Sequence, residues 1–222
     1  MRKLFNVNTL NIFADASIKQ KEDGNYISCS GALCVITKND GSTEVIDQDY
    51  IVLDNSTNNR GETYAVYMAV LFALKYRYQF DVINVISDSQ FVIYSLTKWI
   101  FKWINNIKDD SYINASGNEV ANQDFIKMII NTIIMNNIYI NFYHQKGHAN
   151  TNSKTSKAKH VFYKSNGIML DDFEVKSICY YNDMVDIYSR YKLEENPMNI
   201  RMPLIYGCNF NEKQYKELVN NV

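Results

Sequence analysis

The chain has 222 residues, of which 46% are hydrophobic and 14% aromatic, enough for one decorated domain with a sizeable core. Its formal net charge of −1 gives no overall attraction to nucleic acid, so any such binding must come from local patches. No apolar run approaches the roughly 18 to 20 residues of a membrane span, and the N-terminus lacks the apolar core of a secretory signal. We therefore expect an intracellular protein without membrane association.

The first predicted elements are three antiparallel strands. Residues 10–14 are predicted to form the first strand, and Asp15 follows where we expect that strand to end. Residues 27–37 and 43–53 form two further strand-like runs. The turn between them contains Asp40-Gly41, a strong hairpin signal.

A helix is predicted from Asn58 to about Tyr78. Its apolar residues recur at the spacing typical of a helix packed on a sheet. They are Val66, Ala69, Val70, Ala73 and Leu74. Glu62 is expected in the first turn, where an acidic side chain ordinarily just complements the helix dipole.

The chain then alternates between strand and helix. Residues 82–87 are nearly continuously apolar, as in a strand covered on both faces, and Asp88 follows directly. Next we expect a helix over 89–104, a polar loop, a helix over 122–136 and a strand over 138–143. The pattern predicts an α/β fold with a mixed five-stranded sheet, three antiparallel strands and then parallel ones, flanked by helices.

Aromatic and basic residues alternate in the 89–104 helix. They are Phe91, Lys98, Trp99, Lys102 and Trp103. Trp99 fits a core position as well as a site. Trp103, which adjoins the polar loop, is predicted to be the exposed platform.

The last third contains a histidine loop and a basic insertion. His148 lies in a glycine-containing loop, where a histidine is ordinarily only a solvated polar residue. Residues 151–164 are rich in Asn, Ser, Thr and Lys and predict an exposed insertion. Asn182 is the expected N-cap of a final helix, with Asp186 near its start.

Four carboxylates are predicted to meet at one edge of the sheet. Asp15 and Asp88 are expected to end strands and Glu62 and Asp186 to start helices, and such ends gather where α/β sites form. Carboxylates pressed together raise one another's pKa unless cations neutralise them. Mg²⁺, or Mn²⁺ as a substitute, suits such ligands, and two ions roughly 4 Å apart can activate water and stabilise a leaving oxygen.

Six motifs in order resemble those of type 1 ribonuclease H, and as a set they are far more specific than any one motif. They are Phe13-Ala14-Asp15-Ala16-Ser17, Thr57-Asn58-Asn59-Arg60-Gly61-Glu62, Ser87-Asp88-Ser89-Gln90-Phe91-Val92, Thr97-Lys98-Trp99-Ile100-Phe101-Lys102-Trp103, Lys146-Gly147-His148-Ala149 and Asn182-Asp183-Met184-Val185-Asp186. The resemblance implies an RNase H-like fold. We expect a ribonuclease H domain at 1–196 with an insertion at about 150–179, and a C-terminal extension of unknown role at 197–222.

The resemblance also implies an activity and its catalytic residues. A monomeric endonuclease of this kind hydrolyses the RNA strand of an RNA/DNA hybrid with two metal ions and leaves 5′-phosphate products. Asp15, Glu62, Asp88 and Asp186 would be the catalytic metal ligands. His148 would assist product release or proton transfer.

Three groups of nucleic-acid contacts follow from the same resemblance. One faces the minor groove, where the 2′-hydroxyl distinguishes RNA from DNA, a second binds a DNA phosphate, and a third forms the channel for the DNA strand. The minor-groove group is Asn58, Asn59 and Gln90, the phosphate pocket is Thr57 and Asn122, and the channel is Phe91, Trp99 and Trp103, with Ser17 as a further contact.

The sequence departs from the family in several places. Asn55 stands where relatives with a full phosphate pocket often have Arg, and residues 105–110 replace a Lys-rich protrusion. The long insertion makes the fourth acid ambiguous, and we choose Asp186 over Asp171, Asp172 and Asp183 because it keeps the spacing from Asn182. One hypothesis is that lysines of the insertion clamp the hybrid instead. They are Lys154, Lys157, Lys159 and Lys164.

Other function classes remain open. A binding module with this fold would have lost one or more of the acids, and all are present here. Within the enzyme class, the chain could be the nuclease part of a reverse transcriptase or a DNA-cleaving relative such as a resolvase or transposase. The start at Met1 shortly before the first strand favours a free-standing enzyme.

Overall fold

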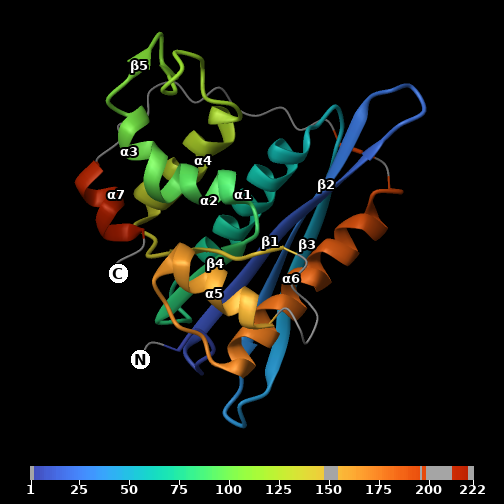
Figure 1. Ribbon diagram of the computed structural model, residues 1–222, viewed down its shortest axis with the longest axis vertical. Coiled ribbons are helices and arrows are strands. Elements are labelled where there is room, and N and C mark those ends of the chain that lie inside the picture. The colour runs from blue at the N-terminus through green and yellow to red at the C-terminus, as the bar shows by residue number, and fades with distance from the viewer. Residues whose placement is uncertain (1–2, 148–154, 196, 199–211, 220–222) are drawn as a thin grey trace.

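The computed structural model describes residues 3–147, 155–195, 197–198 and 212–219. Its main sheet has the strand order β3-β2-β1-β4-β7 (Figure 1). The strands are β1 (Thr9–Gln20), β2 (Tyr26–Thr37), β3 (Thr43–Leu53), β4 (Val82–Ser87) and β7 (Asn141–His144). β1, β2 and β3 pair in antiparallel fashion, whereas β4 and β7 continue from β1 in parallel. The predicted mixed sheet is confirmed.

Helices cover both faces of this sheet (Figure 1). One layer contains α1 (Asn58–Tyr76), α2 (Gln90–Tyr94), the π-helix η1 (Ser95–Trp99), α3 (Ile100–Trp103) and α4 (Gln123–Asn136). The other contains α5 (Thr155–Asn166) and α6 (Asp172–Lys192), while α7 (Glu212–Leu218) packs beside α4. A small hairpin, β5 (Ile107–Lys108) and β6 (Ser111–Tyr112), stands apart. Among the residues described, no helix is both long and apolar enough to span a bilayer.

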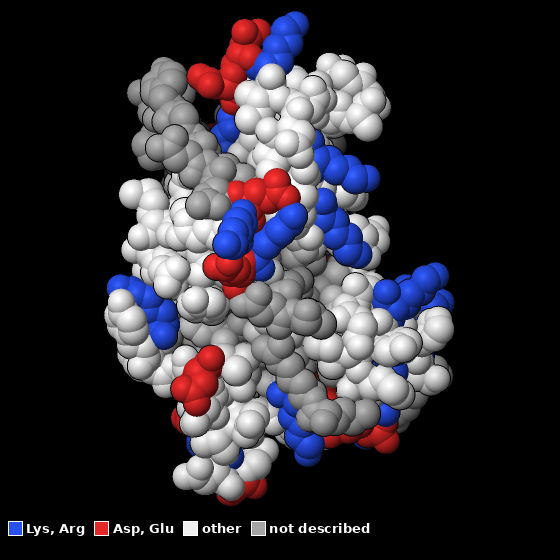
Figure 2. Space-filling model, turned by 90° about the vertical axis from the view of Figure 1, so that its left-hand side faces the viewer, with Lys and Arg blue, Asp and Glu red and all other residues white. Residues whose placement is uncertain are grey.

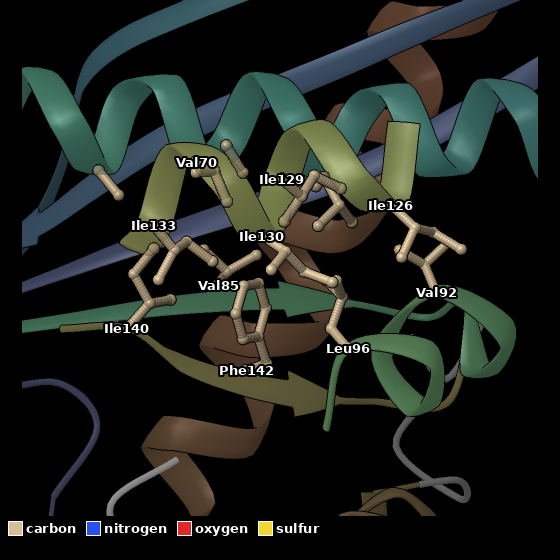
Figure 3. Close-up of a cluster of buried hydrophobic side chains, with 14 of the residues drawn as sticks. Val70, Val85, Val92, Leu96, Ile126, Ile129, Ile130, Ile133, Ile140 and Phe142 are labelled. Atoms are coloured by element: carbon tan, nitrogen blue, oxygen red, sulfur yellow. The ribbon is translucent and has the colours of Figure 1, made fainter. Parts of the chain in front are cut away.

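Strand β1 is buried on both faces, and its side chains alternate between two cores. Leu10, Ile12 and Ala14 join the cluster beneath α1 and α4, whereas Phe13 joins the cluster beneath α6. In the first cluster, side chains of α4 meet those of β4 and β7, as Ile130 and Phe142 do in Figure 3. This double burial fixes β1 as the centre of the fold.

A ladder of asparagine side chains crosses the three parallel strands. Asn84 Nδ2 donates to Asn11 Oδ1 at 2.8 Å, and Asn141 Nδ2 donates to Asn84 Oδ1 at 3.0 Å. Asn11 Nδ2 in turn donates to the Leu4 carbonyl oxygen at 3.1 Å. All three asparagines are buried, and the ladder gives their amide groups hydrogen-bond partners. These bonds form only when the three strands pair in the observed register.

Replacing Asn84 by Ala is expected to lower the free energy of unfolding by about 2 to 4 kcal/mol, because a buried acceptor of Asn11 and a donor of Asn141 lose their partner. Urea denaturation measures this loss. The control is Asn136→Ala, at an exposed position, which should change stability by less than about 0.5 kcal/mol. Equal stability of the two variants would contradict a structural role for the ladder.

Asp15 lies within a strand rather than at its end, contrary to our prediction. β1 continues to Gln20 because β2 pairs with it along its whole length. The parallel pairing with β4, however, stops at Phe13 opposite Ile86. Asp15 therefore lies just beyond the end of the parallel part of the sheet, next to the segment that follows β4.

The prediction that Asn182 caps the last long helix is also wrong. α6 begins ten residues earlier, where Asp171 forms a capping box with Glu174. The Glu174 backbone N–H donates to Asp171 Oδ1 at 2.8 Å, and the Asp171 N–H donates to Glu174 Oε2 at 3.0 Å. Asn182 is buried within the helix, so Asp186 lies far from its start.

The insertion is partly folded onto the domain rather than fully exposed. α5 buries Ala158 and Phe162 in the core beneath α6. At its end, Asn166 bonds to the edge strand β7, because its Nδ2 donates to the His144 carbonyl oxygen at 2.7 Å and its Oδ1 accepts from the His144 N–H at 3.0 Å. The amide thus pairs with the backbone of β7 as a neighbouring strand would.

Candidate active site

Asp15 is the centre of the acidic site. Its side chain is buried, and its Oδ1 accepts a hydrogen bond from the Ala16 N–H at 2.7 Å. Burial raises the pKa of Asp15 well above its usual value, and the negative charges of Asp88, Asp186 and Glu62 raise it further. The structure therefore brings all four predicted acids close enough to act on one another.

Asp88 follows β4 directly and is partly exposed. His144 Nε2 lies 3.2 Å from the Asp88 carbonyl oxygen, and burial lowers the pKa of His144. The loop after β7 also touches Asp88, because a methyl group at Gly147 would overlap the Asp88 carboxylate. His148 itself lies outside the described residues, although its neighbour Gly147 is against the site.

Glu62 reaches the site from α1. It lies one turn inside the helix rather than in the first turn, so its role is not that of a dipole-complementing charge. Asn58 Nδ2 donates to its Oε1 at 2.7 Å and Ser89 Oγ to its Oε2 at 2.5 Å. Burial raises the pKa of Glu62, the Ser89 hydrogen bond opposes this, and the charge of Asp88 adds to it.

Asp186 projects from α6 and is buried. Ser17 Oγ donates to its Oδ1 at 2.9 Å, and Arg190 forms a two-pronged ion pair with the same carboxylate. α6 approaches the sheet closely where Gly31 pairs with Asp15, since a Cβ at Gly31 would lie 2.6 Å from Ser189 Oγ. This close approach places Asp186, rather than the helix-capping Asp171 or the Lys159-bound Asp172, beside Asp15.

The four acids fit a hard divalent cation by their chemistry. Their donors are all carboxylate oxygens, the ligands that Mg²⁺ prefers. Burial, together with the negative charges of the other three acids, raises the pKa of Asp15, and a bound cation would oppose that effect. Within the described ranges, no group of three or more His, Cys, Asp or Glu side chains is placed so that it could hold a metal ion without side-chain movement. Two of the carboxylates are held by side-chain hydrogen bonds, that of Asp186 by Ser17 and Arg190 and that of Glu62 by Ser89 and Asn58.

The residues predicted to bind a DNA phosphate lie around Arg60, which the sequence analysis did not single out. Thr57 caps α1 and its Oγ1 accepts from the Arg60 N–H at 3.2 Å. The Arg60 guanidinium bonds Asp124 at 2.8 Å, lies 3.5 Å from Asn122 Oδ1, and covers the ring of Phe125. No local sequence pattern indicates this link between α1 and α4, because Arg60 and Asp124 are 64 positions apart in the chain.

Phe91, Trp99 and Trp103 form a continuous group that we call the aromatic ledge. The Trp99 ring centroid lies 6.1 Å from that of Phe91 and 6.0 Å from that of Trp103. The ledge, with Lys102, lines a pocket of about 550 Å³. Trp103 is only 9% exposed, so the prediction that it is an exposed platform is wrong, and the less buried Trp99 and Phe91 form the open part.

The remaining predicted contacts are exposed near the acids. Asn59, at the start of α1, and Gln90, two residues after Asp88, are both open to solvent. Of the lysines in the insertion, Lys159 is bound to Asp172, and Lys157 and Lys164 are exposed. Lys154 lies outside the described residues.

Comparisons with known proteins agree with this fold. The RNase H family model matches residues 7–160. Ribonuclease HI of Haemophilus ducreyi (strain 35000HP / ATCC 700724) is 29% identical over 141 residues, which are 64% of this chain and 80% of that protein.

Solved structures show the same fold at lower identity. A foamy viral protease-reverse transcriptase in complex with RNA/DNA hybrid aligns with a TM-score of 0.61 and 13% identity over 87% of this chain, which spans only 21% of that longer protein. LC9-RNase H1, described as a type 1 RNase H with the type 2 active-site motif, aligns with a TM-score of 0.52 and 15% identity over 93% of this chain and 99% of its own.

Proposed function

The chain belongs to the RNase H family, and from this premise we propose that it is an endonuclease that hydrolyses the RNA strand of RNA/DNA hybrids. The observation that carries the proposal is the meeting of four carboxylates, Asp15 and the three acids that face it, supplied by β1, α1, the segment after β4, and α6. Burial and mutual repulsion make this arrangement unfavourable for a protein alone. A fold retains such a group for chemistry rather than for stability.

The chemistry proposed for the site depends on divalent metal, Mg²⁺ or Mn²⁺, held by Asp15, Glu62, Asp88 and Asp186. Two such ions would activate a water molecule and stabilise the leaving oxygen of a phosphodiester. Ser89 and Asn58 orient the Glu62 carboxylate, and Ser17 and Arg190 orient that of Asp186. These contacts fix the direction of each oxygen before substrate arrives, as a preorganised site requires.

In this proposal, the surfaces beside the four acids recognise the RNA/DNA hybrid. Asn58, Asn59 and Gln90 lie next to Glu62 and Asp88, where a scissile RNA strand would expose its 2′-hydroxyls. The aromatic ledge supports the second strand by stacking and apolar contact, with Lys102 as its cation. Thr57 and Asn122 are the proposed phosphate contacts, and Arg60 would hold them in place.

Cleavage of three substrates tests the proposal. The purified chain with Mg²⁺ should cut an RNA/DNA hybrid and leave 5′-phosphate ends, and should leave duplex RNA and duplex DNA of the same sequence intact. Cleavage of duplex DNA in preference to the hybrid would indicate a resolvase-like enzyme instead. Binding without cleavage of any substrate would indicate a non-catalytic module.

Replacing His148 by Ala is expected to reduce turnover by about 10²- to 10⁴-fold, the usual contribution of a proton-transferring side chain, while leaving measurable activity. Steady-state cleavage at saturating hybrid measures this. His160→Ala, an exposed change on α5, is the control and should cut at the wild-type rate. Complete inactivity of His148→Ala would show that the residue binds metal rather than assisting release or proton transfer.

The domain assignment is part of the same proposal. Residues 1–196 form the nuclease domain, with the insertion at about 150–179, and residues 197–222 are an extension. We propose that the enzyme is a monomer and acts inside the cell. α7 of the extension packs against α4, so this extension is in contact with the domain rather than separate from it.

A further inference from the structure

The C-terminal helix α7 contacts the backbone of the segment that carries the aromatic ledge. Tyr215 of α7 is fully buried, and its hydroxyl donates to the Leu96 carbonyl oxygen at 3.2 Å. Leu96 belongs to η1, the π-helix that ends at Trp99, and its side chain points into the core near Phe142 (Figure 3). A side chain from the end of the chain thus bonds to the backbone three residues before Trp99.

The hydrogen bond from Tyr215 lies at the point where the backbone hydrogen bonds of η1 change from the α-helical to the π-helical pattern. The Ile100 N–H donates to the Ser95 carbonyl oxygen, five residues back, instead of to Leu96 as it would in an α-helix. The Leu96 carbonyl oxygen accepts the Tyr215 hydroxyl instead. Tyr215 therefore stabilises η1 in its π register.

The register of η1 decides where the tryptophans point. Each residue of a helix turns the chain by about 100°, so the extra residue of a π-turn changes the direction of everything that follows it. Phe91 precedes η1, whereas Trp99 and Trp103 lie at its end and beyond. The 6.1 Å spacing between the Phe91 and Trp99 rings spans η1 and therefore depends on its register, whereas Trp99 and Trp103 both follow the π-turn and would turn together.

α7 is itself held firmly on both sides. The Leu218 carbonyl oxygen accepts from the Ile140 N–H at 2.9 Å, and Val219 forms a parallel bridge with Ile140 at the edge of the sheet. Towards α3, the Tyr215 ring lies 6.1 Å from Phe101, and Lys216 Nζ lies 5.0 Å above the same ring. α7 and α3 lie side by side in Figure 1.

Among the described residues, α7 itself does not carry a basic patch, because its charged side chains are two glutamates and two lysines. Figure 2 shows the face that bears α7, where acidic and basic side chains lie close together near the centre of the view. Lys216 is paired with Glu212 on α7 itself. The contacts of α7 described above are packing contacts with the domain.

We propose that α7 is a positioning element for nucleic-acid binding, in which Tyr215 sets the aromatic ledge by holding η1 in the π register. The proposal rests on the proposed function in one respect, because the ledge is taken as the surface that supports a strand of the hybrid. It gives the C-terminal extension a role in substrate affinity, at a distance from the metal-binding acids. Tyr215 is a positioning residue and not a catalytic one.

Tyr215→Phe tests the proposal, because it removes the hydroxyl and keeps the buried ring. Trp99 and Trp103 are the two tryptophans of the chain, so tryptophan emission reports on the ledge directly. We expect the emission to shift and the Kd for an RNA/DNA hybrid to rise roughly twofold to tenfold, the effect of one hydrogen bond. Turnover at saturating hybrid and its Mg²⁺ dependence should stay at wild-type values. Tyr139→Phe, at a tyrosine that is 59% exposed, is the control.

Two results would overturn the proposal. Unchanged emission together with unchanged Kd would show that Tyr215 does not set the ledge. Loss of turnover and altered Mg²⁺ dependence along with weaker binding would show a general structural defect, which circular dichroism and thermal unfolding would also register. If the wild-type chain neither binds nor cuts a hybrid, the proposed function fails, and the emission of Tyr215→Phe still decides whether Tyr215 positions the ledge.

Discussion

Replacing Asp88 by Asn is expected to lower the rate of hybrid cleavage by at least about 100-fold without unfolding the protein. The substitution keeps the size of the side chain and removes one negative charge that faces Asp15 and Glu62. The proposed metal ions would lose a ligand, and even the removal of a residue that only supports a ligand commonly costs 10- to 100-fold. Initial rates at saturating Mg²⁺ and hybrid measure the effect.

The matched control for this change is Asp23→Asn, an exposed aspartate in the turn between β1 and β2. It should cut at the wild-type rate. Circular dichroism and urea denaturation should show that Asp88→Asn is folded and no less stable than the wild type. Undiminished cleavage by folded Asp88→Asn would remove this aspartate from the site.

Replacing Asp15 by Asn is expected to abolish activity as well, and at the same time to make the metal-free protein more stable at neutral pH. The wild-type carboxylate is buried and faces three other acids, so its ionised form is unfavourable in the folded state. Asparagine carries no charge, and its Oδ1 can still accept the hydrogen bond from the Ala16 N–H. A functional residue whose replacement stabilises the fold is typical of a site selected for activity.

The pH dependence of this gain follows from the direction of the shift. The pKa of Asp15 in the folded protein lies above the usual 3.8, so folding disfavours ionisation. Ionised Asp15 therefore destabilises the folded wild type fully above the pKa that Asp15 has in the folded protein. This destabilisation fades as pH falls towards 3.8. The excess unfolding free energy of Asp15→Asn should be largest at neutral pH and vanish in acid.

Urea denaturation with EDTA across this pH range measures that excess. Glu22→Gln, at an exposed position in the turn between β1 and β2, is the control and should follow the wild type throughout. Added Mg²⁺ should raise the stability of the wild type more than that of Asp15→Asn, because a ligand stabilises the state that binds it. A variant that is less stable than the wild type at neutral pH would contradict the electrostatic account of Asp15.

Much of the fold followed from local patterns. The sheet strands Val82–Ser87 and Thr43–Leu53 and the N-terminus of α1 lie where apolar periodicity and turn chemistry placed them. These signals are strong because strands in a sheet and helices on its faces bury whole stretches of side chains. The resemblance of ordered motifs to ribonuclease H is confirmed by the family match and the fold.

What the sequence did not provide came from contacts between distant segments. Asp171 and Glu174 have the spacing of a capping box, but they follow a polar insertion, and the start of α6 was not predicted there. The burial of Trp103 and the role of Arg60 depend on α4 packing against neighbouring helices, which no local pattern specifies. The bond from Tyr215 to Leu96 joins residues 119 positions apart.

We propose that Asp15 and the acids that face it cut the RNA strand of a hybrid with the help of divalent metal. The most direct measurement uses one hybrid labelled on either the RNA or the DNA strand, incubated with wild type or Asp88→Asn, in Mg²⁺ or EDTA. We expect fragments only from the RNA strand, only with the wild type and only with Mg²⁺. Fragments from the DNA strand, or RNA cleavage that persists in EDTA or in Asp88→Asn, would contradict it.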